Sequence, residues 1–205
     1  MINITVNLQE TAIKYLKEKD PILGKVIRKV EAPEWNFNSN YFLALIELIV
    51  SQQLSIKAAD TIFGRLKALA PSSELTAQDI LKLDSESMRN AGLSWSKVSY
   101  VKNVAEYSMK NNSVYKKFIS MTDDEIVAEL TKIKGVGTWT AEMFLIFTMG
   151  RPDVFSLGDL GLRKAIERLY GFKNEQIREQ IIQISNKWKP YRSIAARYLW
   201  KSLTL

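Results

Sequence analysis

Residues 130–159 read LTKIKGVGTWTAEMFLIFTMGRPDVFSLGD, and this stretch decides the fold. It opens as the end of an amphipathic helix, turns at residues 135–137 (Gly-Val-Gly), and continues into a second helix over 138–149. A short apolar run then leads to Asp159. Two glycines around one apolar residue make a tight turn, and the first N–H groups of the following helix have no partner within that helix. The turn is therefore suited to bind an anion, because these N–H groups and the helix dipole both favour negative charge.

The composition is that of an ordinary globular protein, with 205 residues, 46% of them hydrophobic and 25% charged. The sequence contains no cysteine, which excludes disulfides, cysteine-bound zinc and an iron–sulfur cluster. It contains no histidine either, so the commonest general base and metal ligand is missing. Acid–base chemistry must therefore use carboxylates, lysine, tyrosine or water.

The net charge of +7 favours a polyanionic partner, and nucleic acid comes first among these. A lysine-rich surface that is merely well solvated is the alternative. No apolar run approaches the roughly 18 residues of a membrane span, and the first residues do not resemble a signal peptide. We therefore expect no membrane partner and a cytosolic location near the nucleoid, or a nuclear one in a eukaryote.

Hydrophobic periodicity predicts an all-α protein of roughly a dozen helices, with one short strand at Ile2–Val6. Asp20 before Pro21 is a typical helix start, and Asn38 or Ser39 is expected to cap the helix after it. Thr122 and Glu125 have the spacing of a capping box. The expected helices span 11–19, 21–30, 41–50, 56–69, 77–83, 85–91, 95–109, 114–119, 122–132, 138–149, 160–170, 175–188 and 190–203.

The segment KGVGTWTA at 134–141, followed by Asp159, resembles the helix–hairpin–helix DNA glycosylase superfamily. IVSQQLS at 49–55, GLSWSK at 92–97 and WKPYRS at 188–193 resemble its 3-methyladenine DNA glycosylase II branch, in matching order. The resemblance covers about 20–203. Longer members of this branch carry an additional N-terminal β-rich domain, and we expect this chain to resemble the compact members without it. It implies two all-α lobes with a DNA-facing cleft. One lobe is expected to span about 33–152, including the hairpin at 122–149, and the other 1–32 plus 153–205.

Asp159 is the candidate catalytic residue. Local sequence alone favours a helix N-cap for it, and the two roles are compatible. The resemblance makes it the carboxylate that stabilises positive charge on the sugar while an N-glycosidic bond breaks. Asp153 is a neighbouring acid at a position that the resemblance marks as less critical.

Trp139 predicts the subclass of enzyme. Family members that also cleave the DNA strand carry a lysine at this position, which attacks the sugar and forms a Schiff base. Tryptophan here implies a monofunctional enzyme that uses water. Lys132 and Lys134 do not match that position.

Aromatic side chains are expected to form the pocket for a base flipped out of the duplex. Alkylated purines carry positive charge, which electron-rich rings attract and which weakens the glycosidic bond. Ordinary core packing is the alternative, and it is favoured for Tyr191 and for two further candidates, Trp35 and Tyr100. The pocket residues implied by the resemblance are Trp139, Trp200, Met143 and Tyr191.

The remaining implied contacts are with the DNA. Gln53 is the expected wedge that fills the gap left by the flipped nucleotide, and an exposed turn residue is its alternative. The hairpin is expected to bind phosphate through Lys134, Gly135, Val136, Gly137, Thr138 and Thr140. The family hairpin often holds a sodium or potassium ion through backbone carbonyls, which match Thr131, Ile133 and Val136 here.

The sequence therefore predicts a monomeric DNA glycosylase that removes alkylated purines, such as 3-methyladenine and 7-methylguanine, from double-stranded DNA. It leaves an abasic site and requires no cofactor. Two alternatives remain open. One is a glycosylase for other lesions, such as hypoxanthine, ethenoadenine or deaminated bases. The other is a non-catalytic DNA-binding module that uses only the hairpin.

Overall fold

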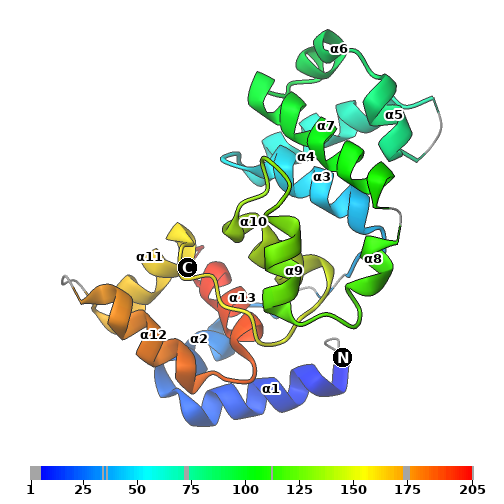
Figure 1. Ribbon diagram of the computed structural model, residues 1–205. Coiled ribbons are helices and arrows are strands. Elements are labelled where there is room, and N and C mark those ends of the chain that lie inside the picture. The colour runs from blue at the N-terminus through cyan, green and yellow to red at the C-terminus, as the bar shows by residue number, and fades with distance from the viewer. Residues whose placement is uncertain are drawn as a thin grey trace. The chain divides into compact units, whose positions relative to one another are not determined.

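The computed structural model describes residues 6–33, 35, 37–71, 74–111, 113–172 and 176–204. These residues form thirteen α-helices and one π-helix and contain no strand (Figure 1). The all-α prediction is therefore confirmed. The strand expected at 2–6 lies outside the described residues except for Val6, where helix α1 begins.

Contacts divide the chain into two compact units. Unit 1 contains residues 38–144, and unit 2 combines 2–37 with 145–205. We expected lobe limits near 33 and 152. The difference arises because residues 145–152 pack within unit 2. There the carbonyl of Pro152 accepts from the N–H of Ser193, and the Phe147 ring contacts Trp200.

Unit 1 is organised around helix α7, which packs against α3, α5 and α6 (Figure 1). The buried face of α7 includes Val98, Val101, Val104 and Ala105, at the spacing of one helix face. Helix α3 also contacts α4 and α10, and α9 packs on α10. The helices of unit 1 are α3 Tyr41–Ser51, α4 Ile56–Ala68, α5 Ala77–Lys82, α6 Ser85–Asn90, α7 Trp95–Lys110, α8 Val114–Lys117, α9 Asp123–Leu130 and α10 Thr138–Met143.

Unit 2 is organised around helix α13, which contacts α1, α2 and α11 (Figure 1). Every residue of α13 from 193 to 199 is buried, so this helix is enclosed on all sides. Ser193, Ala195 and Ala196 are small and allow its neighbours to approach closely. The helices of unit 2 are α1 Val6–Lys19, α2 Pro21–Lys29, α11 Leu160–Tyr170, α12 Ile177–Lys187 and α13 Arg192–Ser202.

Asp20 connects three helices of unit 2. Its Oδ1 accepts from the N–H groups of Ile22 and Leu23, as expected for the N-cap of α2. Its Oδ2 accepts from Trp188 Nε1 at 2.8 Å and from the Tyr170 hydroxyl at 2.6 Å. Asp20 is 4% exposed, so these donors satisfy a carboxylate that would otherwise be costly to bury.

Most predicted helix ends are confirmed. The capping box of Thr122 and Glu125 is present, and α11 ends at Gly171 in the left-handed conformation. The predicted cap of α3 was wrong. Asn40 is the N-cap and accepts from the N–H of Leu43, whereas the side chain of Asn38 accepts from the N–H of Asn40. Both asparagines can make such local bonds, and only the nearer one reaches the first turn.

The second helix of the hairpin is not a regular α-helix throughout. It is α-helical over Thr138–Met143 and continues as a π-helix, η1, over Phe144–Thr148. The wider π turn changes the direction of the side chains that follow. Phe144 and Ile146 are fully buried, whereas Phe147 is 38% exposed.

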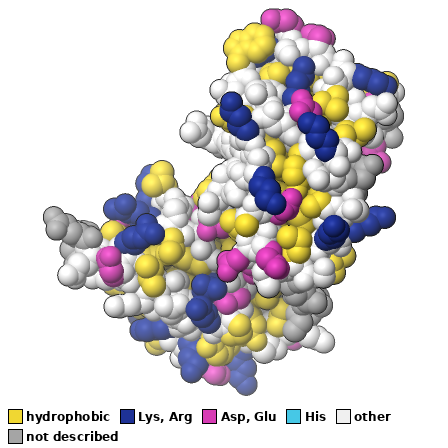
Figure 2. Space-filling view, in the orientation of Figure 1, with side chains coloured by type: hydrophobic (Ala, Val, Ile, Leu, Met, Phe, Trp, Pro, Cys, Tyr) yellow, Lys and Arg dark blue, Asp and Glu magenta, His cyan; other side chains and the backbone are white. Residues whose placement is uncertain are grey.

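Basic side chains are spread over the face of the molecule seen in Figure 2 and do not form one block. Among the described residues, no helix has the length and hydrophobicity needed to cross a bilayer.

Candidate active site

Asp159 is the N-cap of α11. Its Oδ1 accepts from the N–H of Leu162 at 2.7 Å and from Trp200 Nε1 at 2.8 Å. Asp159 as a whole residue is 9% exposed. The predicted cap is thus confirmed, and a second donor from α13 fixes the same oxygen. A carboxylate held in this way is oriented before any substrate binds.

Gly161 leaves room for the hydrogen bond between Asp159 and Trp200. A Cβ at position 161 would lie 3.1 Å from Asp159 Oδ1 and 3.2 Å from Trp200 Nε1. Both distances are shorter than ordinary van der Waals contact. A side chain here would displace one partner of the bond, so Gly161 contributes to the geometry of the carboxylate.

An aromatic stack continues from Trp200 within unit 2. The Trp200 and Phe147 rings lie 5.4 Å apart at 33°. The guanidinium carbon of Arg197 lies 4.5 Å from the centre of the Phe147 ring and 4.5 Å from that of Trp35. Burial lowers the pKa of Arg197 to about 10, so it is still cationic at neutral pH. We call Trp200, Phe147, Arg197 and Trp35 the aromatic stack.

The hairpin of unit 1 runs from the end of α9 at Leu130 to the start of α10 at Thr138. Gly135 has φ +105°, and a Cβ there would lie 2.2 Å from Tyr100 Cγ. The close approach at Gly135 is thus made by Tyr100, which supports the turn. Gly137 has open space around its Cα and is the N-cap of α10, so a phosphate could approach the backbone there.

The peptide between Lys134 and Gly135 has a fixed orientation. Asn103 Nδ2 donates to the carbonyl of Lys134 at 2.9 Å. In a trans peptide the N–H points opposite to the carbonyl, so the N–H of Gly135 is directed away from Asn103. Lys132 forms an ion pair with Glu129, which compensates its charge within the protein.

Gln53 lies on the turn between α3 and α4. It has φ +58°, a conformation that no other described non-glycine residue adopts. Its side chain is exposed, as required of a wedge. Lys97 Nζ donates to the carbonyls of Val50 and Gln52, both at 2.7 Å, and holds the end of α3 in place.

Comparison with known proteins identifies the family. The family described as HhH-GPD superfamily base excision DNA repair protein matches residues 46–190. The chain is also 35% identical over 163 residues to DNA-3-methyladenine glycosylase 1 of Schizosaccharomyces pombe, across 78% of this chain and 72% of that protein. The chain belongs to the HhH-GPD superfamily.

A solved structure and a bacterial relative support this assignment. The solved structure of an S. pombe 3-methyladenine DNA glycosylase, Mag1, in complex with abasic DNA matches with a TM-score of 0.84 and 31% identity, over 95% of this chain and 97% of that one. A putative DNA-3-methyladenine glycosylase of Bacillus subtilis is 30% identical over 78% of this chain. The chain spans 58% of the length of that relative.

Several site residues expected of an HhH-GPD protein lie where they could contact DNA. Trp139 is 37% exposed in the first turn of α10. Lys134 and Thr138 are exposed on the hairpin, and Gln53 is exposed on its turn. Trp200 contacts Asp159 directly. Their contacts with DNA remain predictions.

The structure places other candidates differently. Thr140 is 2% exposed and its Oγ1 accepts from Gln52 Nε2, so its side chain is not available to a phosphate. The motif alone predicts a phosphate contact for Thr140, but α10 turns this side chain inward. Tyr191 packs edge-on against Tyr15 at 5.4 Å, as the core-packing alternative predicts. Met143 is 4% exposed.

Four residues of the candidate site are not among the residues predicted from the sequence: Phe147, Arg197, Gly161 and Gln52. The sequence predicts a regular helix at Phe147, because a π turn has no recognisable sequence pattern. Arg197 stands in an apolar helix, which is a usable signal, since a charged residue in a buried segment requires partners. Gln52 stands beside Gln53, and the sequence indicates only that both belong to the segment between two helices.

The hairpin carbonyls are compatible with a monovalent cation. Helix α9 ends at Leu130, so the carbonyls that follow lack helical partners. The carbonyl of Ile133 accepts one hydrogen bond, from Val136 N–H at 2.9 Å, which leaves it a second lone pair. Among the residues described, no group of three or more acidic side chains could hold a metal ion.

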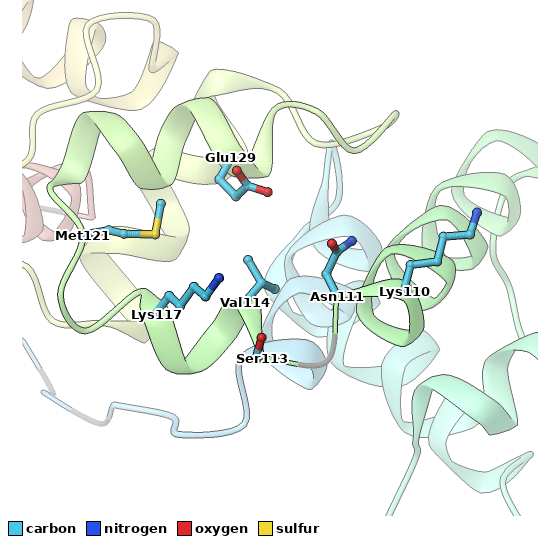
Figure 3. A pocket seen from close by; sticks show the side chains of 7 residues that line it. All are labelled: Lys110, Asn111, Ser113, Val114, Lys117, Met121 and Glu129. Atoms are coloured by element: carbon cyan, nitrogen blue, oxygen red, sulfur yellow. The ribbon is translucent and has the colours of Figure 1, made fainter.

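A separate polar pocket of about 400 Å³ lies between the end of α7 and α9 (Figure 3). None of the predicted site residues lines it. Glu129 is also bonded to the Tyr107 hydroxyl and to Lys132. The lining residues are Lys110, Asn111, Ser113, Val114, Lys117, Met121 and Glu129.

Proposed function

We propose that this chain is a DNA glycosylase that hydrolyses the N-glycosidic bond of alkylated purines in duplex DNA and leaves an abasic site. The observation that carries the proposal is the carboxylate of Asp159, oriented by Leu162 N–H and Trp200 Nε1. Relatives named DNA-3-methyladenine glycosylase support the substrate class.

Asp159 supplies negative charge where the reaction develops positive charge. As the glycosidic bond breaks, the deoxyribose becomes similar to an oxocarbenium ion, which a fixed carboxylate stabilises. The carboxylate can also orient the attacking water. Because its orientation is set by two donors in the folded protein, little reorganisation is needed when the charge develops.

The leaving group needs little assistance when the base is an alkylated purine. Such a base is already cationic, so it departs as a neutral molecule without prior protonation. This suits a chain that has no histidine. The exposed face of Phe147 and the half-buried ring of Trp200, both in unit 2, are the aromatic surfaces we assign to binding the cationic ring.

We assign binding of the DNA backbone to the hairpin, and we assign the role of the wedge to Gln53. The N–H groups around Gly137 and the charge of Lys134 suit a phosphate. A sodium or potassium ion on the carbonyls of Thr131, Ile133 and Val136 would add positive charge next to that phosphate. Replacing potassium by tetramethylammonium at equal ionic strength should then weaken binding to duplex DNA, measured by fluorescence anisotropy.

The reaction class is monofunctional in this proposal, because Trp139 replaces the lysine that forms a Schiff base in strand-cleaving members. Borohydride added during turnover should therefore trap no covalent protein–DNA adduct. A trapped adduct would overturn this part of the proposal. We further propose that the protein acts as a monomer wherever the cell keeps its DNA.

The decisive experiment compares Asp159→Asn with Asp153→Asn on DNA that contains 7-methylguanine. Asparagine at 159 can still accept from Leu162 and Trp200 but carries no charge, so excision should fall by about a hundredfold or more. Asp153 pairs with Arg192 at 2.8 Å, and its variant should retain excision. Full activity of Asp159→Asn would overturn the catalytic assignment.

Single-turnover excision from a panel of lesions tests the substrate class. Alkylated purines should be removed fastest. Faster removal of hypoxanthine, ethenoadenine or a deaminated base would show that the protein is a glycosylase for that lesion and not for alkylated purines. Binding to DNA without excision of any lesion would favour the non-catalytic module.

A further inference from the structure

Gln52 connects two structural features of unit 1 that the sequence presents separately. Its Nε2 donates to the carbonyl of Gly135 at 3.2 Å and to Thr140 Oγ1 at 3.1 Å. Gly135 belongs to the phosphate-binding hairpin, and Thr140 lies in the helix that follows it. Gln52 itself immediately precedes Gln53, the proposed wedge. One side chain therefore bonds the wedge turn to both sides of the hairpin turn.

The backbone of Gln52 is fixed as well as its side chain. Lys97 donates to the carbonyls of Val50 and Gln52, which lie at the end of α3 where helical partners are missing. Partial burial lowers the pKa of Lys97 from its ordinary value, because removal from water disfavours the charged ammonium group. The wedge turn is thus anchored to α7 through its main chain and to the hairpin through the Gln52 side chain.

Gln53 requires this support. Its φ of +58° is unfavourable for a side chain that bears a Cβ, and such a conformation persists only where the surroundings determine it. The residues on either side of Gln53 supply those surroundings. The N–H of Leu54 donates to the carbonyl of Ser51 at 3.1 Å, which closes the turn.

We propose that Gln52 is a positioning residue that couples the phosphate-binding hairpin to the wedge turn. Through its two hydrogen bonds, the hairpin bound to a phosphate fixes where Gln53 enters the duplex. Gln52 itself makes no contact with the base in this scheme. The inference rests on the proposed function, because a wedge has a role only where a base is flipped.

The buried position of Thr140 has a function in this scheme. Thr140 is 2% exposed, and its hydroxyl accepts from the partly buried amide of Gln52, which would otherwise lack this partner. Thr140 therefore acts on the DNA only through Gln52. This distinguishes it from Thr138, which is exposed on the same turn.

The test separates base flipping from binding. Gln52→Ala, Gln52→Glu, Thr140→Val and the double variant Gln52→Ala/Thr140→Val are compared in the full chain. Flipping is followed by the fluorescence of 2-aminopurine beside the lesion, and excision is measured in single turnover. Affinity for undamaged duplex is measured by anisotropy. Gln78→Ala, exposed on α5, and Thr61→Val, exposed on α4, are the matched controls.

We expect Gln52→Ala to slow flipping and excision by about tenfold while affinity for undamaged duplex changes by less than about threefold. Gln52→Glu should behave alike, since it keeps the size of the side chain but loses the N–H donors. Thr140→Val should show a smaller effect, because it removes only one of the two hydrogen bonds of Gln52. The double variant should match Gln52→Ala, because Gln52→Ala alone already removes the bond to Thr140. A structural role alone would lower affinity, flipping and melting temperature together.

Two outcomes overturn the coupling. One is flipping and excision by Gln52→Ala at the wild-type rate, and the other is additive loss in the double variant. Neither outcome touches the proposed function, which fails separately if the wild-type protein excises no lesion.

Discussion

Trp200 Nε1 donates to Asp159 Oδ1 over 2.8 Å, and this bond links the buried helix α13 to the N-terminus of α11. The two residues are 41 positions apart. Trp200 thus has two functions in our scheme, as an aromatic surface and as a hydrogen-bond donor. Substitution can separate the functions, because phenylalanine retains an aromatic ring but has no N–H group.

Trp200→Phe should lower single-turnover excision about tenfold to a hundredfold, since the carboxylate loses one of the donors that orient it. The phenylalanine ring can still contact Phe147, so affinity for abasic DNA should change little. Trp95→Phe, exposed in unit 1, is the matched control. Wild-type excision by Trp200→Phe would mean that the hydrogen bond does not contribute to the reaction.

Gly161→Ala should impair excision without unfolding the protein. The new methyl group would lie 3.1 Å from Asp159 Oδ1 and would move either the carboxylate or the indole. Gly64→Ala is the control, because a Cβ at this helical position meets no atom within 4 Å. That control should raise stability by about 0.5–1 kcal/mol through helix propensity. Denaturant unfolding and excision assays check both, and equal activity of the two variants would contradict the prediction.

The sequence predicted local features well and long-range packing poorly. Asp159 and Asp20 were recognised as caps because an N-cap depends on residues two or three positions away. The additional bonds of these carboxylates, to Trp200 and Trp188, come from helices far along the chain. Hydrophobic periodicity along the sequence does not indicate which distant residues will form such bonds.

The same limit applies to the candidate site. The hairpin and Gln53 could be located because a turn has a local signature. The partners of Arg197 could not be predicted, since the rings that enclose it come from Trp35 and Phe147, far away in sequence. The inward position of Thr140 likewise depends on Gln52, 88 residues away.

The guanidinium of Arg197 should maintain the aromatic stack. Arg197→Ala would open a space between the Phe147 and Trp35 rings, and Phe147 would no longer be fixed against Trp200. We expect excision to fall about tenfold, with at least partial recovery on adding millimolar methylguanidinium, which fits between two rings as a cation. Urea at equal concentration is the control for denaturation. Loss of activity that methylguanidinium does not reverse would contradict this role.

Stability should fall at alkaline pH because of Tyr170. Its hydroxyl donates to Asp20 Oδ2, and burial together with that carboxylate raises the pKa of Tyr170 above its ordinary value. The folded protein therefore retains the phenolic proton at a pH where the unfolded chain has released it. The contribution of this group to the free energy of unfolding is therefore constant below about pH 10 and decreases as pH rises above it, by at most about 1.4 kcal/mol per pH unit.

Tyr170→Phe isolates this contribution. The variant should be less stable than wild type at pH 7 by about 1–2 kcal/mol, because Asp20 loses a donor while it stays buried. Above pH 10 its stability should decline less steeply, so the two curves converge. Burial also raises the pKa of Tyr107, Tyr115 and Tyr198, so a residual decline is expected in the variant. Urea unfolding between pH 7 and 11 gives both curves. Parallel curves for wild type and Tyr170→Phe above pH 10 would show that Tyr170 does not hold its proton in the way the bond to Asp20 requires.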